Sequence, residues 1–340
     1  MKVLLIGGTG VISKAISRRL LEEGHELWMI NRGKRLEGIP KGAHLLCADI
    51  NYEEEKVTQM LGDQTFDVVA DFIAFVPQQL ERDHRLFAKR TKQFIYISSA
   101  SAYQKPASDF RINEGTPLAN PYWQYSRNKI SGEELMMRYY REEGFPVTIV
   151  RPSHTYNEEK VPVCVHGPKG SWQVVKRMIE EKAVIIPGDG SSLWTLTWND
   201  DFAKGFIGLM GNAHAIGEAV QITSDEVLTW NQIYQVIADA LGVELKPYYV
   251  ASEFLASCSP KEWDLRGNLW GDKSNTVFFD NTKLKRLVPD FKAVVRFDQG
   301  VRRSLEYILS HPEYQIPDPE FDAWCDRVIE VQEEALAKMR

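Results

Sequence analysis

The sequence predicts an α/β fold in which a doubly wound parallel sheet occupies the first half of the chain. Two observations support this prediction. Short apolar segments alternate with longer amphipathic ones through the first half of the 340 residues, and such alternation produces βαβ units with right-handed crossovers. Several apolar segments also lack the regularly spaced polar residues of a half-exposed strand, which is typical of parallel strands covered on both faces.

The expected strands of this sheet are residues 3–6, 26–30, 44–50, 67–73, 94–98 and 147–150. A helix over 13–23 follows the first strand and ends at Gly24, a residue favoured in left-handed helix caps. Pro77 can open another helix that runs to about residue 90, because proline is well tolerated in a first helical turn. Strand and helix therefore alternate through the whole first half.

The second half of the chain is less regular. After Arg151 and Pro152, loops rich in Gly, Pro and Trp separate the predicted helices, which cover 171–181, 200–210, 229–241 and 320–340. The last of these is charged and is expected to be a solvated outer helix. At about 150 residues per domain the length suggests two folding units. With no linker-like break in composition, the second half is expected to pack onto the edge of the sheet.

Composition and charge limit the class of protein. The chain has 41 Lys and Arg against 47 Asp and Glu, a net charge of −6, so nucleic acid is not the default partner, although a local basic patch stays open. No segment approaches the roughly 20 apolar residues of a membrane span, and the apolar run after Lys2 is too short for a signal peptide. The four cysteines are far apart, as expected of reduced thiols in a cytoplasmic protein.

A glycine-rich turn directly follows the first strand. It reads Gly7-Gly8-Thr9-Gly10-Val11-Ile12-Ser13 and opens the first helix. Glycines permit a tight turn with close backbone approach, and the helix N-terminus presents N–H groups to a pyrophosphate. The alternative is an ordinary glycine turn. The phosphate-binding interpretation predicts a Rossmann-like dinucleotide-binding domain over 1–152 and a smaller, mainly substrate-binding region over 153–340, with some elements of the second region returning to the sheet.

The end of the second strand bears on cofactor choice. It reads Asn31-Arg32-Gly33-Lys34-Arg35 and has no acidic residue to bind the ribose hydroxyls of NAD. Its cations could instead neutralise a 2′-phosphate, which favours NADP over NAD, or they could form a merely solvated basic turn. Either NAD or NADP is therefore the expected cofactor.

Tyr-x-x-x-Lys occurs at Tyr52, Tyr125 and Tyr156, and context separates the three occurrences. Tyr125 lies on the helix between the fifth and sixth strands, where an i,i+4 pair shares one face with Lys129. The ammonium of Lys129 can then lower the phenol pKa towards neutrality and make Tyr125 a proton donor or acceptor. Serines at the end of the fifth strand, within 98–103, face the ligand crevice in such a fold and can bind a substrate oxygen; turn formation is their alternative explanation.

Taken together, these residues resemble the extended short-chain dehydrogenase/reductase family, the NAD-dependent epimerases and dehydratases. The resemblance covers nearly the whole chain and includes GGTGVIS, YISSASAY (96–103), YSRNK, RPSHTY (151–156), PGDGS (187–191) and FFDNTKLKRL (278–287). It implies that Ser99, Tyr125 and Lys129 are catalytic and that the chain forms a homodimer. The residues implied at the cofactor are Gly7, Gly10, Val11, Ile12, Asn31, Arg32, Asp49, Ile50 and Lys129.

The sequence departs from this family on the substrate side. His154 stands where nucleotide-sugar enzymes commonly have Asn, and no Arg follows Gly-Asp-Gly-Ser to grip a diphosphate. Ala100-Ser101 replaces the Asp-Glu pair of the dehydratases. UDP- or dTDP-sugars and sugar dehydration are therefore disfavoured. The candidate substrate contacts are Ser101, His154, Tyr156 and Trp194, although aromatic residues of this kind also serve as core packing; the spacing of His154, Cys164 and His166 fits no compact metal site.

The sequence therefore predicts an enzyme, an NAD(P)-dependent epimerase or oxidoreductase acting on a secondary alcohol or ketone such as a sugar or sugar derivative. Tyr125 would exchange the hydroxyl proton and Ser99 would polarise the oxygen, while Lys129 would hold the ribose. The alternative is a dinucleotide-binding, RNA-binding protein that resembles the chloroplast stem-loop-binding proteins. A scaffold that binds the dinucleotide without turnover is a third hypothesis.

Overall fold

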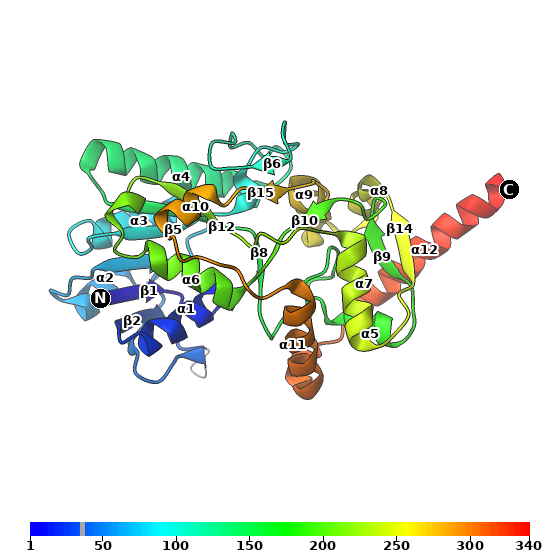
Figure 1. Ribbon diagram of the computed structural model, residues 1–340, viewed down its shortest axis with the longest axis horizontal. Helices are drawn as coiled ribbons and strands as arrows, with labels where there is room; N and C mark the ends of the chain where they lie inside the picture. Colours follow the sequence, from blue (N-terminus) through cyan, green and yellow to red (C-terminus); the bar gives the residue numbers. More distant parts are fainter. Residues whose placement is uncertain (35–37) are drawn as a thin grey trace.

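A central parallel sheet of seven strands organises the first part of the computed structural model, which describes residues 1–34 and 38–340 (Figure 1). The strand order is β12-β7-β5-β4-β1-β2-β3, with every pairing parallel. The strands are β1 (Lys2–Ile6), β2 (Glu26–Asn31), β3 (His44–Cys47), β4 (Val68–Asp71), β5 (Phe94–Ile97), β7 (Val147–Pro152) and β12 (Ala219–Ile222). The predicted doubly wound α/β fold is confirmed.

Alternate residues of β1 enter two different cores. Val3 and Leu5 pack with α1 (Val11–Glu22) and α6 (Asn199–Leu209) on one face of the sheet. Leu4 and Ile6 pack on the other face with α2 (Glu54–Leu61), α3 (Pro77–Phe87) and α4 (Gln124–Glu143). Both faces are covered, so the strands are apolar almost throughout.

The second part of the chain builds a separate lobe. Its core contains buried aromatic residues, and it is framed by α5 (Trp172–Ile179), α7 (Trp230–Leu241), α8 (Ser252–Cys258), α9 (Leu265–Asn268), α11 (Phe297–Ser310) and α12 (Pro319–Met339). The short paired strands are β8 (His154–Tyr156) with β11 (Leu196–Trp198), β9 (Val184–Pro187) with β14 (Pro247–Val250), and β10 (Leu193–Trp194) with β13 (Leu228–Thr229). At the boundary with the sheet, β6 (Arg111–Ile112) pairs with β15 (Phe278–Phe279), and α10 (Thr282–Leu287) follows.

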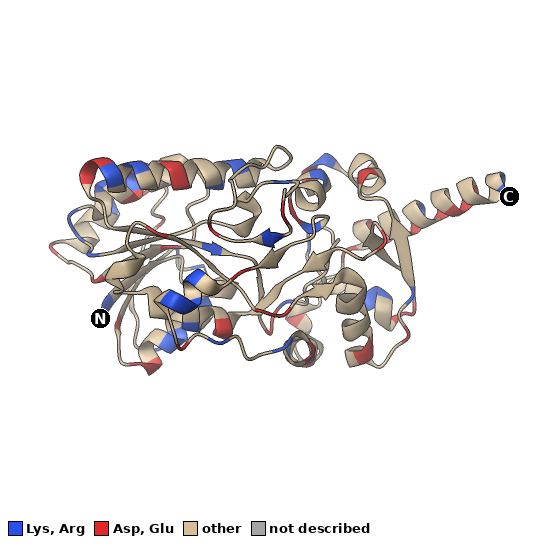
Figure 2. Ribbon diagram, turned by 45° about the horizontal axis from the view of Figure 1, so that its top comes forward, with Lys and Arg blue, Asp and Glu red and all other residues tan. Residues whose placement is uncertain are grey.

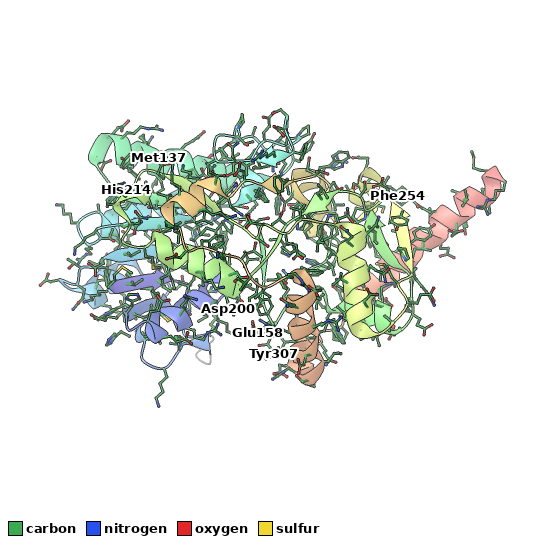
Figure 3. All side chains as sticks on the ribbon, in the orientation of Figure 1. Met137, Glu158, Asp200, His214, Phe254 and Tyr307 are labelled. Atoms are coloured by element: carbon green, nitrogen blue, oxygen red, sulfur yellow. The ribbon has the colours of Figure 1, made fainter. Side chains whose placement is uncertain are left out.

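Two segments connect the lobes closely. The second half of the sequence supplies strand β12 to the sheet and helix α6 to one of its faces. Figure 3 places Asp200 of α6 and Glu158 where the two parts meet. Arg18 of α1 forms an ion pair with Asp200. The domain boundary at residue 152 stays a prediction.

Several predicted elements have other bounds in the structure; the fourth strand, predicted over 67–73, is Val68–Asp71. The third strand ends at Cys47, three residues before the predicted end, so Asp49 and Ile50 lie in the turn that follows. The last helix is solvated only in its second half. Phe321, Trp324 and Val328 are buried against the second lobe because they recur on one helix face, and the remainder extends away from the body (Figure 1).

Candidate active site

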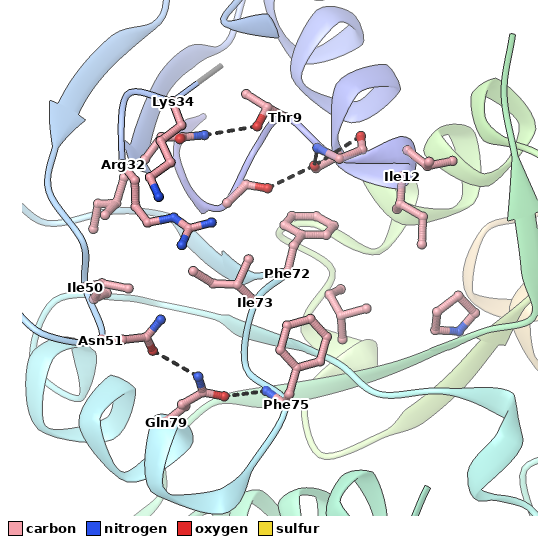
Figure 4. Close-up of a pocket in the computed structure, with 18 of the residues that line it drawn as sticks. Thr9, Ile12, Arg32, Lys34, Ile50, Asn51, Phe72, Ile73, Phe75 and Gln79 are labelled. Atoms are coloured by element: carbon pink, nitrogen blue, oxygen red, sulfur yellow. Dashed lines mark hydrogen bonds between the residues drawn. The ribbon is translucent and has the colours of Figure 1, made fainter. Parts of the chain in front are cut away.

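A cavity of about 680 Å³ lies at the carboxyl ends of the sheet strands (Figure 4). Its size is ordinary for a cofactor or substrate pocket. Most of the predicted cofactor residues line it, namely Gly7, Gly10, Val11, Ile12, Asn31, Arg32, Ile50 and Lys129. Asp49 is not among the lining residues, and its carboxylate instead lies 3.9 Å from the Arg32 guanidinium. Phe72, Ile73, Phe75 and Gln79 also line the cavity but were not predicted from the sequence. They follow β4, and segments after the carboxyl ends of parallel strands commonly face the ligand.

The glycine turn is shaped for close approach. Gly7 has φ +83°, and a Cβ there would lie only 2.4 Å from Cγ2 of Ile73. The Ser13 hydroxyl donates to the Gly7 carbonyl at 3.0 Å and accepts from the Gly10 N–H at 2.9 Å. Ser13 therefore fastens the turn at the position where many such turns have a third glycine. The first-turn amides of α1 face outward without intrahelical acceptors, which fits the pyrophosphate of a dinucleotide.

The far end of the cavity is basic and amide-rich. The Asn31 side chain donates to the Thr9 hydroxyl at 3.2 Å, and Arg32 is largely exposed beside Lys34 on the cavity wall. Ala48 and Ile50 supply apolar surface there. Arg35, the remaining cation of the predicted basic turn, lies outside the described residues. A dinucleotide therefore fits both the glycine turn and this end of the cavity.

A chain of hydroxyls follows β5. Ser99 caps the short 3-10 turn Ala100–Ala102, and its Oγ lies 2.9 Å from that of Ser101. The Ser126 hydroxyl of α4 donates to Ser101 at 2.7 Å. Ser101 is buried and saturated by these neighbours, so its predicted role as a substrate contact does not match its position. Ser99 remains partly exposed and adjoins Tyr125.

Tyr125 and Lys129 share one face of α4 beside the cavity, as predicted. The predicted effect of Lys129 on the phenol is wrong in this structure. Burial raises the pKa of Tyr125, and the hydrogen bond with Ser99 only partly offsets this. Lys129 Nζ lies 5.7 Å from the centroid of the Tyr125 ring and donates to the carbonyls of Ala74 and Ile97 at 2.7 Å each. Burial lowers the pKa of Lys129 itself to about 8.

The candidate substrate residues of the second lobe are split. Tyr156 is 1% exposed and packs against Trp198 and Phe297, so it belongs to the core. Trp194 is 3% exposed, and its indole N–H donates to Nδ1 of His154 at 3.2 Å. Only His154 is partly reached by solvent. Trp123, which directly precedes α4, is the aromatic residue near the phenol, with its ring centroid 4.9 Å from that of Tyr125.

Within residues 1–34 and 38–340, no cluster of three or more His, Cys, Asp or Glu side chains could hold a metal ion. Over the same residues, no helix has the length and apolar character needed to cross a bilayer. Basic and acidic side chains are interspersed along α4, and acidic side chains lie along the length of α12 (Figure 2).

The sequence profile of the NAD-dependent epimerase/dehydratase family matches residues 3–223, more than half of the chain. The chain belongs to this family. The predicted epimerase/dehydratase-type enzyme of the short-chain dehydrogenase/reductase group is thereby confirmed. The family is NAD-dependent. The glycine turn and the residues around it fit a dinucleotide of this kind.

Several known proteins are similar to this family member. The 2′-dehydrokanamycin reductase of Streptomyces kanamyceticus is 23% identical over 293 residues, 86% of this chain and 80% of the reductase. The chloroplast stem-loop binding protein of 41 kDa b from Arabidopsis thaliana is 25% identical over 256 residues, 71% of this chain and 63%, less than two thirds, of that protein. Among solved structures, the UDP-glucuronic acid 4-epimerase of Bacillus cereus in complex with NAD has a TM-score of 0.70 at 20% identity, covering 92% and 98% of the two chains.

Proposed function

We propose that this family member is an NADP- or NAD-dependent reductase or epimerase that acts at a secondary alcohol or ketone of a sugar-like substrate. The observation that carries the proposal is the placement of Tyr125. Its phenol adjoins the Ser99 hydroxyl at the carboxyl edge of the sheet and lines the same cavity as the glycine turn. A proton-transfer group and a dinucleotide cradle therefore open onto one space.

In this mechanism Tyr125 holds the transferable proton at its phenol oxygen. Because burial raises the phenol pKa, the neutral form predominates at pH 7 and can donate to a carbonyl oxygen. Ser99 Oγ hydrogen-bonds the same substrate oxygen and orients it. Lys129 keeps a positive charge beneath the phenol ring, fixed by two backbone carbonyls. A bound nicotinamide dinucleotide would supply or accept the hydride at the substrate carbon.

The cofactor is proposed to be NADP in preference to NAD. Arg32 and Lys34 project at the cavity end where a ribose 2′-phosphate would lie (Figure 4). A hydrogen bond to a charged group contributes about 1.5–3 kcal/mol, so Arg32→Ser should weaken NADPH binding roughly tenfold or more. NADH binding should change little. Lys41→Ser, an exposed lysine further along the same connection, is the matched control. Equal losses of NADPH and NADH affinity would refute this preference.

Turnover tests the assignment of Tyr125. Purified protein is assayed with NADPH or NADP against a panel of ketones and secondary alcohols that includes sugars, sugar acids and sugar phosphates. Tyr125→Phe should lose roughly 10²- to 10⁴-fold in kcat on any substrate found. Tyr52→Phe is the control, because Tyr52 is 89% exposed and begins the Tyr-x-x-x-Lys occurrence nearest the N-terminus. Full turnover by Tyr125→Phe would exclude the proposed mechanism.

Mass spectrometry of the dinucleotide released on denaturation separates the two reaction types. About one retained NAD(H) or NADP(H) per chain would favour an epimerase that recycles its cofactor. Protein free of dinucleotide would favour a net reductase or dehydrogenase. We also propose that the protein is cytoplasmic and forms a homodimer that pairs through α4 and its neighbour α3. Light scattering of the purified protein would check the dimer.

A further inference from the structure

Asn51 lines the large cavity, but it belongs neither to the glycine turn nor to the Asp49-Ile50 pair that the family resemblance implied. It lies in the turn after β3 and is exposed. Its side chain is hydrogen-bonded to Gln79 of α3, which lines the same cavity (Figure 4). The residues that contact Asn51 determine which way its amide group points.

Two backbone N–H groups fix the orientation of the Gln79 side chain. The N–H groups of Phe75 and Val76 donate to Gln79 Oε1 at 2.6 and 3.1 Å, so this position requires the amide oxygen. The nitrogen of the same side chain then faces Asn51, and Nε2 donates to Asn51 Oδ1 at 2.9 Å. A flipped Gln79 amide would set its own N–H groups against two backbone donors.

Arg82 imposes the same orientation on Asn51. A guanidinium group has only donors, and Nη1 of Arg82 donates to Asn51 Oδ1 at 2.6 Å. Arg82 is 4% exposed, and its Nη2 lies 3.0 Å from Asp71 Oδ2 and 2.6 Å from Asp83 Oδ1. Turning it away would leave two buried carboxylates without their counter-charge, which is strongly destabilising. Asn51 Oδ1 therefore accepts from two fixed donors, whereas its Nδ2 has no partner among residues 1–34 and 38–340.

Asn51 consequently offers the cavity a donor and no acceptor. Figure 4 places it beside Ile50, with Ile73 nearby, and both side chains line the cavity with apolar surface. A purine base has flat apolar faces and ring nitrogens along its edge that accept hydrogen bonds. Since Tyr125 requires the nicotinamide at the other end of a bound dinucleotide, the base is the part of the cofactor that suits the surroundings of Asn51.

We propose that Asn51 is a specificity-determining residue for the cofactor, whose Nδ2 donates to a ring nitrogen of the adenine base. Arg82 and Gln79 act through Asn51 and are positioning residues. The inference rests on the proposed function, because it requires a dinucleotide in this cavity. It concerns the base, whereas Arg32 and Lys34 are proposed to act on the 2′-phosphate.

The test compares Asn51→Asp with the wild type in calorimetric titrations of NADPH and of NADH. Aspartate has the same shape and keeps an oxygen for Arg82 and Gln79, but it replaces the free donor with an acceptor. Both dinucleotides should bind more weakly by roughly tenfold or more. Gln78→Glu is the matched control, because Gln78 is exposed on the same helix as Gln79, is not among the lining residues and gains the same charge. It should leave both affinities unchanged.

Fragments of the cofactor locate the contact. AMP carries the base but neither the 2′-phosphate nor the nicotinamide, so its affinity should fall in Asn51→Asp by the same factor as that of NADH. The affinity for reduced nicotinamide mononucleotide should not change. The Tm of nucleotide-free Asn51→Asp should equal or exceed that of the wild type, because the contacts with Arg82 and Gln79 remain.

Three results would overturn the inference and leave the proposed function standing. They are an unchanged affinity for AMP, a loss confined to NADPH, and an equal loss for reduced nicotinamide mononucleotide. A loss confined to NADPH would assign Asn51 to the 2′-phosphate instead of the base. Wild-type protein that binds neither NADPH nor NADH would overturn both the inference and the proposed function.

Discussion

The glycine turn makes a quantitative prediction, because Gly7 combines two separate constraints. Its φ of +83° is unfavourable for a residue with a side chain, and a Cβ would lie 2.4 Å from Ile73 Cγ2. The backbone conformation costs about 1–2 kcal/mol for alanine, and overpacking adds about 1–3 kcal/mol. Gly7→Ala should therefore lower the free energy of unfolding by about 2–5 kcal/mol.

Gly24 provides a control that isolates the steric part. Its φ is +77°, but nothing lies within 4 Å of the position of its Cβ. Gly24→Ala should therefore show only the conformational cost of about 1–2 kcal/mol. Urea denaturation of the dinucleotide-free proteins, compared at equal m-value, measures both.

A double-mutant cycle with Ile73→Ala completes the test. Removing Cγ2 should recover part of the Gly7→Ala loss, giving a coupling energy of about 1 kcal/mol or more between the two sites. If Gly7→Ala costs no more than Gly24→Ala, or if the coupling is absent, the close packing of turn and β4 end would be refuted. Dinucleotide affinity, measured on the same variants, should fall for Gly7→Ala and stay unchanged for Gly24→Ala.

Three further outcomes are expected. Arg151 donates to the buried Glu133 carboxylate at 2.9 Å through Nε, so Glu133→Gln should cost about 3–5 kcal/mol by leaving the guanidinium without its counter-charge; a loss below about 1 kcal/mol in urea denaturation would contradict this. Burial raises the pKa of Asp272 from 3.8 to about 6, so its carboxyl favours the folded state when protonated, and wild-type stability is lost as pH rises through this window. Asp272→Asn should flatten the stability curve there and gain at most about 3 kcal/mol at pH 7, and an unchanged curve would refute it. Trp324→Ala should cost about 3–5 kcal/mol, whereas Leu336→Ala on the protruding half of α12 should stay within about 0.5 kcal/mol; thermal or urea unfolding compares the pair, and equal losses would mean that the whole helix is packed.

Much of the site was predictable because its signals are local. The glycine turn lies between a strand and a helix in the sequence, and the spacing of Tyr125 and Lys129 places them on one helix face whatever surrounds them. The carboxyl ends of parallel strands meet at one edge, which brought Asn31 and Ile50 to the same cavity.

The sequence by itself determined the parallel sheet, the glycine turn and the helix carrying Tyr125, since periodicity and short spacings specify each of them. Only the tertiary structure decided which polar and aromatic residues lie inside. Tyr156 and Trp194 are core residues, Ser101 is saturated by its neighbours, and Asn120 ties the Ser101 carbonyl to the Gly271 carbonyl. Burial and pairing depend on segments more than a hundred residues apart, such as the Asn120 link to Gly271, and no local pattern records them. The same long-range burial raises the pKa of Tyr125, which the i,i+4 spacing alone had suggested would fall.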